Sequence, residues 1–284
     1  MEYRLIALDL DGTLLGSDKE ISPRNRKALA AARERGIVTV IATGRSAHSA
    51  RMFSQQVGGG PVICCNGAEI LESDGSVITQ RPLPLAPLLR VIALCEEERL
   101  LCECYTSGRI VLDRPAAHAA TYFRWVRGRR STARATFDLV RIWQLNRMRW
   151  VRSLRKWAEM PDREPVLKLM IIGPREGLER LAERIEREAP GLAVTSSGHE
   201  NIEVGAAGVS KGAALELLGA RLKIPRQAMV AVGDGANDLE MLRYAGLGVA
   251  MGNASEGVKS AADRVTATCD DDGVARLVEE VLLA

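Results

Sequence analysis

Two carboxylates stand where a buried strand is expected to end. The stretch "YRLIALDLDGTLLGSD" (residues 3–18) places Asp9 and Asp11 two positions apart after an apolar run. In an extended strand, residues two apart point to the same side, so both face one point beyond the strand end. Open α/β sheets bind their ligands there. Gly12 permits a tight turn, and Thr13 offers a hydroxyl or a backbone N–H to an anion. The alternative interpretation is a plain Asp-Gly turn.

A second pair of acids follows another apolar run. In "VAVGDGANDLEML", Asp234 and Asp238 lie four residues apart, which lets both carboxylates approach one point if a helix begins near Asn237. Four carboxylates at the ends of two parallel strands repel one another unless a cation lies among them. Oxygen ligands of this kind favour Mg²⁺ over zinc. Asp238 also fits the role of a helix cap, and the two roles are compatible.

Polar groups suited to phosphate occur in two further segments. "VIATGR" ends in Thr43, Gly44 and Arg45, which supply a hydroxyl and backbone amides at an expected helix start. "GVSKGAAL" places Lys211 at a similar point, beside a glycine that permits close approach. A lysine that opens a helix is commonly a solvated charge, so neither segment is decisive alone. An acidic nucleophile, a metal, a hydroxyl and a lysine together indicate phosphoryl transfer.

The elements that must position these groups alternate in type at both ends of the chain. Apolar strands are expected at "LIAL", "IVTVIATGR", "PVICCNGA", "AMVAVGD" and "GLGVAM", with helices such as Pro23 to Arg35 between them. This alternation favours an α/β protein whose parallel sheet is covered on both faces. Mixed short strands and helices between them indicate a separate α+β unit. We therefore expect a core of residues 1–82 and 204–284, with an α+β unit inserted at 83–203.

Length and composition fit two globular domains. The 284 residues are 46% hydrophobic and 26% charged, and no apolar stretch reaches the roughly 18 residues that span a bilayer. The N-terminus lacks a small-residue cleavage site after its apolar run, so we expect no signal peptide. Six cysteines without a CxxC pair, and only three histidines, do not favour zinc. Most of these cysteines lie in apolar segments, which indicates buried free thiols and a cytoplasmic location.

Four motifs, in their order and spacing, resemble those of a known family. "DLDGTLL", "TGR", "GVSKG" and "GDGANDLEML" are similar to the motifs of the haloacid dehalogenase-like superfamily. "ISPRNRKALAAARERGI", "NGAE" and "GLGVAMGNASEGVKSAADRVT" resemble its Cof-like phosphatases in particular. The match covers nearly all of both core segments, whereas residues 83–190 match only in the order of helices and strands. The resemblance implies a Rossmann-like parallel-sheet core with an inserted α+β cap domain.

The resemblance also implies a reaction in two steps. Asp9 would attack phosphorus and form an aspartyl-phosphate, which divides one hard displacement into two. Asp11 would protonate the leaving oxygen and then take a proton from the attacking water. Thr43 and Lys211 would bind the transferring oxygens and offset their charge. Family members that need a long-lived phospho-enzyme lack an acid at this second position, so Asp11 favours a phosphatase or a phosphomutase.

A magnesium site and a substrate site follow from the same resemblance. Mg²⁺ would be held by the carboxylates of Asp9, Asp234 and Asp238. The backbone carbonyl of Asp11 would be a fourth ligand. Substrate contacts are expected from Thr43, Gly44, Arg45, Asn66, Lys211 and Asn237. Many Cof-like proteins carry two asparagines before "GA", whereas Cys65 precedes Asn66 here. Because Cys65 replaces the first of these asparagines, the contacts of this loop with the substrate are expected to differ from those of such proteins.

These roles predict a Mg²⁺-dependent phosphatase of small phosphorylated metabolites, either sugar phosphates or phosphorylated cofactors, over which the cap closes. A phosphomannomutase-like phosphotransferase shares the two N-terminal aspartates and is an alternative. A third hypothesis is a non-catalytic protein that binds a phosphorylated metabolite or nucleic acid, although every catalytic position is filled. We expect neither nucleic acid nor a membrane as a partner. The sequence leaves the physiological substrate and the oligomeric state open.

A basic segment lies within the expected cap. Between Thr121 and Trp157 there are eleven Lys or Arg residues and a single acid. Trp143, Trp150 and Trp157 recur every seven residues, so they would share one face if the segment were a single helix. The pattern fits a solvated cap helix, a surface that gathers anionic substrates, or one that binds a membrane or nucleic acid.

Overall fold

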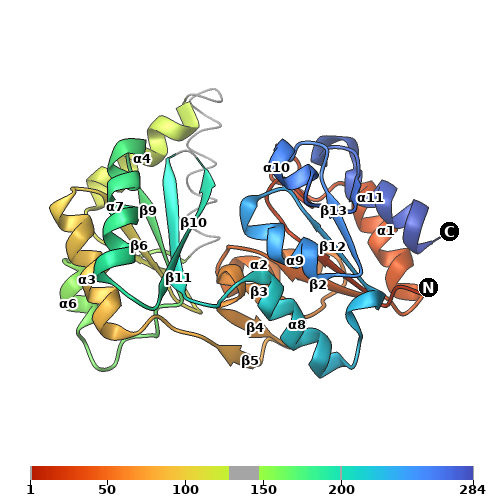
Figure 1. The fold of residues 1–284 in the computed structure, drawn as a ribbon, viewed down its shortest axis with the longest axis horizontal. Coiled ribbons are helices and arrows are strands. Elements are labelled where there is room, and N and C mark those ends of the chain that lie inside the picture. Colours follow the sequence, from red (N-terminus) through yellow and green to blue (C-terminus); the bar gives the residue numbers. More distant parts are fainter. Residues whose placement is uncertain (1, 128–146, 199, 284) are drawn as a thin grey trace. The chain divides into compact units, whose positions relative to one another are not determined.

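The chain divides into two compact units (Figure 1). The structure, a computed structural model, describes residues 2–127, 147–198 and 200–283. The first unit consists of Met1–Gln80 and Gly208–Ala284, and the second unit is Arg81–Ala207. The second unit is therefore an insertion in the sequence of the first.

An eight-stranded sheet forms the centre of the first unit. Its strands lie in the order β14-β13-β12-β1-β2-β3-β4-β5, and all neighbours from β14 to β3 run parallel. These strands are β1 (Leu5–Leu8), β2 (Val38–Ala42), β3 (Val62–Cys64), β4 (Glu69–Leu71), β5 (Val77–Gln80), β12 (Met229–Gly233), β13 (Leu247–Ala250) and β14 (Arg264–Val265). The α/β prediction is thus confirmed for the part of the sheet that carries the catalytic motifs.

At one edge the sheet continues with two antiparallel strands that were not predicted from the sequence. Strands β4 and β5 pair antiparallel with each other, and β4 pairs antiparallel with β3. Antiparallel neighbours need only a tight turn between them, whereas parallel ones need a crossover. Here the turn contains Asp74 and Gly75, with Gly75 at a φ of 93°. The backbone N–H of Ser76 donates to Asp74 Oδ1 at 2.7 Å within the turn, and the N–H of Glu72 donates to the carbonyl of Ser76 at 2.9 Å, which closes the hairpin.

Helices cover both faces of this sheet (Figure 1). They are α1 (Pro23–Glu34), α2 (Ala47–Gln56), α8 (Lys211–Leu222), α9 (Leu239–Tyr244), α10 (Glu256–Lys259) and α11 (Gly273–Leu277). Short 3₁₀ turns η1 (Cys65–Gly67), η2 (Arg226–Ala228), η3 (Ala236–Asp238) and η4 (Cys269–Asp271) lie between elements, and a π-type turn η5 (Val278–Leu282) follows α11. Two serines begin helices as N-caps, because the Oγ of Ser22 accepts from the N–H of Asn25 and that of Ser210 from Ala213.

Strand β1 is buried on both faces. Leu5 and Ala7 belong to an apolar cluster that also contains Leu215 of α8, and the alternate residues Ile6 and Leu8 are equally inaccessible to solvent. Alternate side chains of a strand point to opposite faces, so complete burial means that each face packs against helices. The first polar position that the strand reaches is therefore at its C-terminal end.

A six-stranded sheet of order β10-β11-β9-β6-β7-β8 forms the second unit. Its neighbours pair antiparallel, except for β7 and β8, which are parallel. The elements are α3 (Leu85–Glu97), β6 (Leu101–Tyr105), β7 (Ile110–Leu112), α4 (Pro115–Arg127), β8 (Arg149–Trp150), α6 (Leu154–Ala158), β9 (Lys168–Ile172), α7 (Arg175–Glu188), β10 (Leu192–Gly198) and β11 (Asn201–Ala206). Because β11 pairs with β9 and β10, the second unit extends past the expected boundary at 203 to Ala207.

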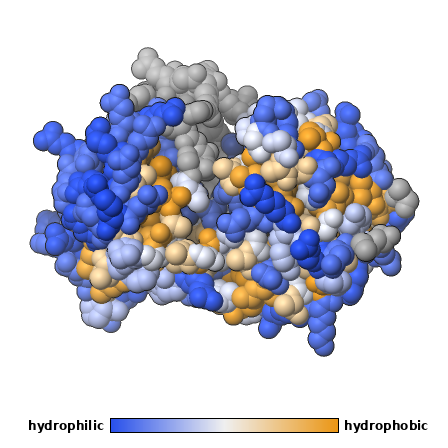
Figure 2. All heavy atoms as spheres, in the orientation of Figure 1, coloured by the Kyte–Doolittle hydropathy of each residue, from blue (hydrophilic) through white to orange (hydrophobic). Residues whose placement is uncertain are grey.

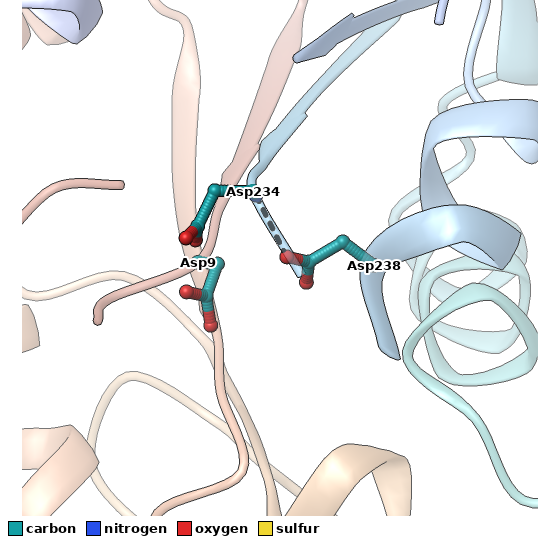
Figure 3. Close-up of side chains that lie close together, drawn as sticks. All are labelled: Asp9, Asp234 and Asp238. Atoms are coloured by element: carbon teal, nitrogen blue, oxygen red, sulfur yellow. Dashed lines mark hydrogen bonds between the residues drawn. The ribbon is translucent and has the colours of Figure 1, made fainter. Parts of the chain in front are cut away.

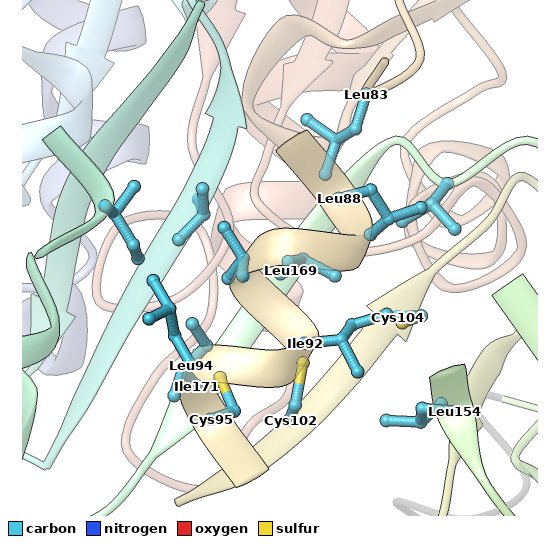
Figure 4. Close-up of a cluster of buried hydrophobic side chains, with 14 of the residues drawn as sticks. Leu83, Leu88, Ile92, Leu94, Cys95, Cys102, Cys104, Leu154, Leu169 and Ile171 are labelled. Atoms are coloured by element: carbon cyan, nitrogen blue, oxygen red, sulfur yellow. The ribbon is translucent and has the colours of Figure 1, made fainter. Parts of the chain in front are cut away.

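Helices α3, α6 and α7 pack with this sheet around a separate apolar core (Figure 4). Cys95 of α3 and Cys102 and Cys104 of β6 lie within that core, and each is nearly inaccessible to solvent. All six cysteines of the chain are free thiols. The five that are buried behave as small apolar side chains, as expected for most of the cysteines, whereas Cys269 is partly exposed.

Charged side chains cover the outer face of α7, and Figure 2 shows a hydrophilic surface over this part of the second unit. Along the helix, Arg175 pairs with Glu179 at 2.7 Å and Arg184 with Glu188 at 3.2 Å. Such i,i+4 pairs add a few tenths of a kcal/mol each to a helix. Among the residues that the structure describes, no helix combines the length and the apolar character needed to cross a membrane.

The described parts of the basic segment belong to separate elements, so the condition under which its tryptophans would share one helix face is not met. Trp150 lies in β8 and is 40% exposed, whereas Trp157 lies in α6 and is buried. Trp143 is outside the described residues. Strand β8 pairs with β7, Leu112 being the partner of Trp150, and this sheet pairing overrides the seven-residue spacing.

Candidate active site

Two acids leave adjacent parallel strands at the same edge of the sheet. Asp9 follows the last residue of β1, and Asp234 follows the last residue of β12. The two strands pair in register, Leu8 opposite Val232, and the backbone N–H of Asp9 continues the pairing by donating to the carbonyl of Val232 at 3.0 Å. The parallel pairing therefore brings two distant segments of the sequence to one point.

Three carboxylates converge at this point (Figure 3). Oxygens of Asp9, Asp234 and Asp238 all lie within 4.8 Å of one another. The turn η3 aims Asp238 back at the strand end, where its Oδ2 accepts from the backbone N–H groups of Asp234 at 3.0 Å and Gly235 at 2.9 Å. Asp238 thus closes the capping box of the turn η3 that leads into α9 and contributes to the cluster, although its side chain makes no cap hydrogen bond to α9 itself.

Lys211 lies between two of these carboxylates. Its Nζ is 2.6 Å from Asp9 Oδ1 and 2.6 Å from Asp238 Oδ1, and its side chain is completely buried. Burial disfavours the charged ammonium, but Asp238 and Asp9 outweigh this effect and raise the pKa of Lys211. The interpretation of Lys211 as a solvated charge is therefore wrong, because α8 begins against the carboxylate cluster and not at the surface.

The cluster carries more negative charge than Lys211 balances. Burial raises the pKa of Asp9 to about 8, with Lys211 opposing the shift and Asp238 and Asp234 adding to it. Burial and the neighbouring Asp238 likewise raise the pKa of Asp234 to about 6. Excess negative charge among oxygen donors is the setting that hard divalent cations occupy in proteins. The three carboxylates therefore fit the expected Mg²⁺.

The carboxylate of Asp11 pairs with two cationic side chains instead of joining the cluster. Arg45 binds it with two hydrogen bonds, Nε to Oδ2 at 2.7 Å and Nη2 to Oδ1 at 2.8 Å, and the Nζ of Lys19 lies 2.9 Å from Oδ1. Burial alone would raise the pKa of Asp11, but Arg45 and Lys19 hold it well below its usual range. The expectation of four converging carboxylates is thus corrected to three.

The turn after β1 contacts the cluster through Gly12 and Thr13. Gly12 has a φ of 81°, and a Cβ at this position would lie 2.3 Å from Asp234 Oδ2, so only glycine fits. The Oγ1 of Thr13 donates to Asp234 Oδ1 at 3.0 Å. The sequence suggested that this hydroxyl would face a bound anion, but its partner is the carboxylate of Asp234, which belongs to the site itself.

The end of β2 carries Thr43, which is 1% exposed. Its N–H donates to the carbonyl of Ile63 at 2.9 Å, and its Oγ1 accepts from the N–H of Arg45 at 3.2 Å. Gly44 lies between them and completes the "TGR" segment that precedes α2. This turn also aims Arg45 at Asp11, so the second motif contacts the first.

The loop after β3 adopts an unusual backbone. Cys65 and Asn66 have φ values of 48° and 57°, in the left-handed region that asparagine tolerates and cysteine rarely adopts. The N–H of Cys65 donates to the carbonyl of Arg45 at 2.9 Å and that of Asn66 to Thr43 at 3.1 Å, which holds the loop. The side chain of Asn66 accepts from Asn237 Nδ2 at 3.2 Å. Asn66 and Asn237, which are both expected to contact the substrate, therefore lie side by side.

Sequence reasoning assigned no role to Lys19, although it touches the site. Lys19 has a φ of 65° in the loop after β1, and its N–H donates to the carbonyl of Gly16 at 2.9 Å, so a tight turn carries its side chain back to Asp11. The only signal in the sequence was a basic residue in the loop that follows two acids. Asp18, the acid that precedes Lys19 in this loop, is exposed.

A family model of haloacid dehalogenase-like hydrolases matches residues 6–278, and the chain belongs to this family. The chain is 31% identical over 285 residues to the pyridoxal phosphate phosphatase YbhA of Escherichia coli, covering all of both chains. It is 30% identical to the 5-amino-6-(5-phospho-D-ribitylamino)uracil phosphatase YcsE of Bacillus subtilis, over 100% of this chain and 97% of that protein. A solved haloacid dehalogenase-like hydrolase from B. subtilis superposes with a TM-score of 0.88, 31% identity, and 98% and 100% coverage of this chain and that one.

These relatives confirm the resemblance to Cof-like phosphatases and the predicted α/β fold. They also confirm the predicted class of enzyme, a phosphoric monoester hydrolase of the haloacid dehalogenase-like type.

Proposed function

We propose that the protein is a Mg²⁺-dependent phosphatase that hydrolyses small phosphorylated metabolites through an aspartyl-phosphate on Asp9. The observation that carries the proposal is the buried cluster in which Lys211 lies 2.6 Å from both Asp9 and Asp238. A carboxylate at a strand end, one fixed cation and a set of oxygen donors are the parts that phosphoryl transfer requires.

The reaction proceeds in two displacements. A carboxylate oxygen of Asp9 attacks phosphorus, the bond from phosphorus to the leaving oxygen breaks, and that oxygen takes a proton from the carboxyl of Asp11. Asp11, now ionised, takes a proton from water as the water oxygen attacks phosphorus, and the bond to Asp9 breaks to release phosphate. Lys211 and Thr43 offset the charge that the transferring oxygens carry in both transition states.

In the resting protein, the contacts of Asp11 favour its role as the base that takes a proton from water. Arg45 and Lys19 hold its carboxylate in the ionised form, which is the form that accepts a proton. For the first displacement Asp11 must carry a proton, so a contact with Arg45 or Lys19 has to open before the leaving oxygen is protonated. Arg45 is also expected near the substrate, and an anionic substrate would compete with Asp11 for it.

Mg²⁺ fits the carboxylates of Asp9, Asp234 and Asp238, together with the backbone carbonyl of Asp11. When bound, a cation of this kind neutralises negative charge on the transferring group and on the carboxylates. Asp9 then stays ionised and nucleophilic despite its burial. Asn66 and Asn237 orient the substrate beside this centre.

We infer the substrate class from the site together with the names of the related enzymes. Related enzymes are named for pyridoxal phosphate and for a phosphorylated ribitylaminouracil. We extend this to phosphorylated cofactors, their precursors and sugar phosphates. The second unit acts as the cap that excludes bulk water and selects among them. The free thiols fit a reducing compartment, the cytoplasm.

A panel of phosphorylated metabolites, assayed with Mg²⁺ and with chelator, tests the function. We expect release of inorganic phosphate from pyridoxal phosphate, from phosphorylated pyrimidine intermediates or from sugar phosphates, lost in chelator and restored by added Mg²⁺. Chelator should also lower the melting temperature, because a ligand at 100 times its Kd stabilises the folded state by about 2.7 kcal/mol. Full activity in metal-free buffer would contradict the role of the carboxylates.

The same panel separates the two alternatives. A phosphomannomutase-like enzyme would move phosphate between positions of a sugar and release little of it into solution. A non-catalytic binding protein would retain a phosphorylated metabolite without turnover.

Changing Asp11→Asn should lower kcat by about 10²–10⁴-fold, because the amide neither donates nor accepts the required proton. If dephosphorylation becomes the slower step, labelled phospho-enzyme accumulates after an acid quench. The measurement is a rapid-quench assay of both displacements. Equal rates in variant and parent for both displacements would remove the role assigned to Asp11.

A further inference from the structure

Asn253, in the loop after β13, contacts three separate segments of the first unit. Its Nδ2 donates to the backbone carbonyl of Gly12 at 2.8 Å and lies 3.5 Å from Asp234 Oδ2. Its Oδ1 accepts from the backbone N–H of Cys269 at 2.9 Å. A side-chain amide has two N–H donors and one carbonyl acceptor. Each of these groups therefore has an assigned partner, and two of the partners belong to the active site.

The carboxylate of Asp234 is held from two sides. Thr13 donates to Oδ1 at 3.0 Å, and Asn253 approaches Oδ2 at 3.5 Å. Gly12 lies against the same carboxylate, where a Cβ would come within 2.3 Å of Oδ2. Asn253 is thus in contact with both the turn after β1 and the carboxylate that follows β12. Its amide group supplies donors to two acceptors, the Gly12 carbonyl and the Asp234 carboxylate, that would otherwise repel each other.

The C-terminal segment fixes Asn253 and the loop after β1 together. The N–H of Cys269 binds Asn253, and the next residue, Asp270, accepts from the N–H of Ser17 at 2.7 Å. Ser22 donates to Asp272 Oδ1 at 2.5 Å. The position of Asn253 is therefore set by a segment that also holds the loop beyond the catalytic turn.

We propose that Asn253 is a positioning residue for the metal centre, which holds the Asp234 carboxylate and the turn after β1 in the arrangement that binds Mg²⁺. This inference rests on the proposed Mg²⁺-dependent function. Side chains that hydrogen-bond to metal ligands typically contribute 10–100-fold to metal affinity, because they fix the ligand's orientation before the metal binds. Asn253 is itself exposed and need not contact either the metal or the substrate.

The test compares Asn253→Ala with the parent by titrating MgCl₂ into metal-free protein in a calorimeter, without substrate. We expect the Kd for Mg²⁺ to rise about 10-fold or more. The Mg²⁺ concentration for half-maximal activity should rise in parallel, while kcat at saturating Mg²⁺ recovers most of the parent value. Asn253→Ser is a second variant with the same expectation, because a shorter hydroxyl cannot bridge Gly12 and Cys269.

Ser22→Ala is the matched control, since it removes another bond between the N-terminal loop and the C-terminal segment without touching Asp234. The Ser22 variant and the two Asn253 variants should all melt at a lower temperature than the parent. Only the Asn253 variants should bind Mg²⁺ more weakly. Unchanged Mg²⁺ affinity in them, in a parent that binds Mg²⁺, would overturn the inference and leave the proposed function intact. A parent that neither binds nor needs Mg²⁺ would overturn both.

Discussion

Changing Asp9→Asn should reduce turnover by at least about 10⁴-fold, comparable with the loss of a covalent nucleophile in other enzymes. The amide keeps the shape of the side chain and can still accept from Lys211, but it cannot form the acyl phosphate. The measurement is phosphate release with the best substrate of the panel. Labelled phospho-enzyme should be absent from the acid-quenched variant. Appreciable residual activity would be incompatible with the proposed mechanism.

The same variant should fold at least as well as the parent in chelator. The pKa of Asp9 is about 8 in the folded protein, above its ordinary value of 3.8. Folded Asp9 therefore keeps a proton that the unfolded chain has lost, and the parent's free energy of unfolding falls as the pH rises from about 4 to about 8. Asn at this position removes that contribution. Asp18→Asn, at an exposed acid of the following loop, is the matched control and should leave both activity and this pH dependence unchanged.

Changing Lys211→Met should cost both activity and stability. The side chain is completely buried between Asp9 and Asp238, so its removal leaves two carboxylates without their cation. Loss of one member of a buried ion pair costs about 3–5 kcal/mol, and loss of one donor to the transferring oxygens lowers kcat about 10²–10³-fold. Chemical denaturation in chelator above about pH 8, where Asp9 is ionised, measures the first effect, and phosphate release measures the second.

A double variant separates charge from packing at this site. Adding Asp9→Asn to Lys211→Met removes one of the two unbalanced carboxylates, so Asp9→Asn should stabilise the Lys211→Met variant by more than it stabilises the parent. Such coupling between contacting residues appears as a departure from additivity. If the two changes were simply additive and both destabilising, the ion pair would not be the source of the cost.

The positions of the proposed catalytic groups could be predicted because strand ends are local features. Asp9, Asp234 and Lys211 each follow or open an element whose apolar or helical pattern is plain in the sequence. Parallel pairing of β1 with β12 then brings them together. The buried Lys211 also shows the limit of this reasoning, because burial depends on which segment packs opposite. A helix that opens with lysine has the same sequence whether it begins at the surface or against a carboxylate.

The contacts of side chains with partners far along the chain could not be predicted. Asp11 stands beside Asp9 in the sequence, but Arg45 and Lys19 decide where its carboxylate points. Thr13 bonds to Asp234, a residue 221 positions away. No local pattern encodes a distance of that kind, so the expectation of four converging carboxylates overlooked the two nearby cations.

In the sheets, two errors had different origins. The β4–β5 hairpin carries a readable signal, since Asp74 and Gly75 lie between two runs of strand-forming residues. Neither strand of this hairpin is among those expected from the sequence. The tryptophan spacing was a misleading signal, because Trp150 pairs in a sheet and Trp157 packs in a short helix. Three tryptophans at a seven-residue spacing are too short a pattern to outweigh the pairing of strands in a sheet.

The insertion of the second unit into the first has a consequence for folding kinetics. Lys211 and Asp9 are 202 residues apart, whereas Lys211 and Asp238 are only 27 apart. Chains are synthesised from the N-terminus, and domains generally fold as units. The second unit, with its own apolar core, is complete before β12 has left the ribosome. Until then β1 has β2 on one side but lacks β12 on the other, and closing so long a loop makes the pairing of β1 with β12 a slow event. Completion of the central sheet and the onset of catalytic activity are thus one and the same late step.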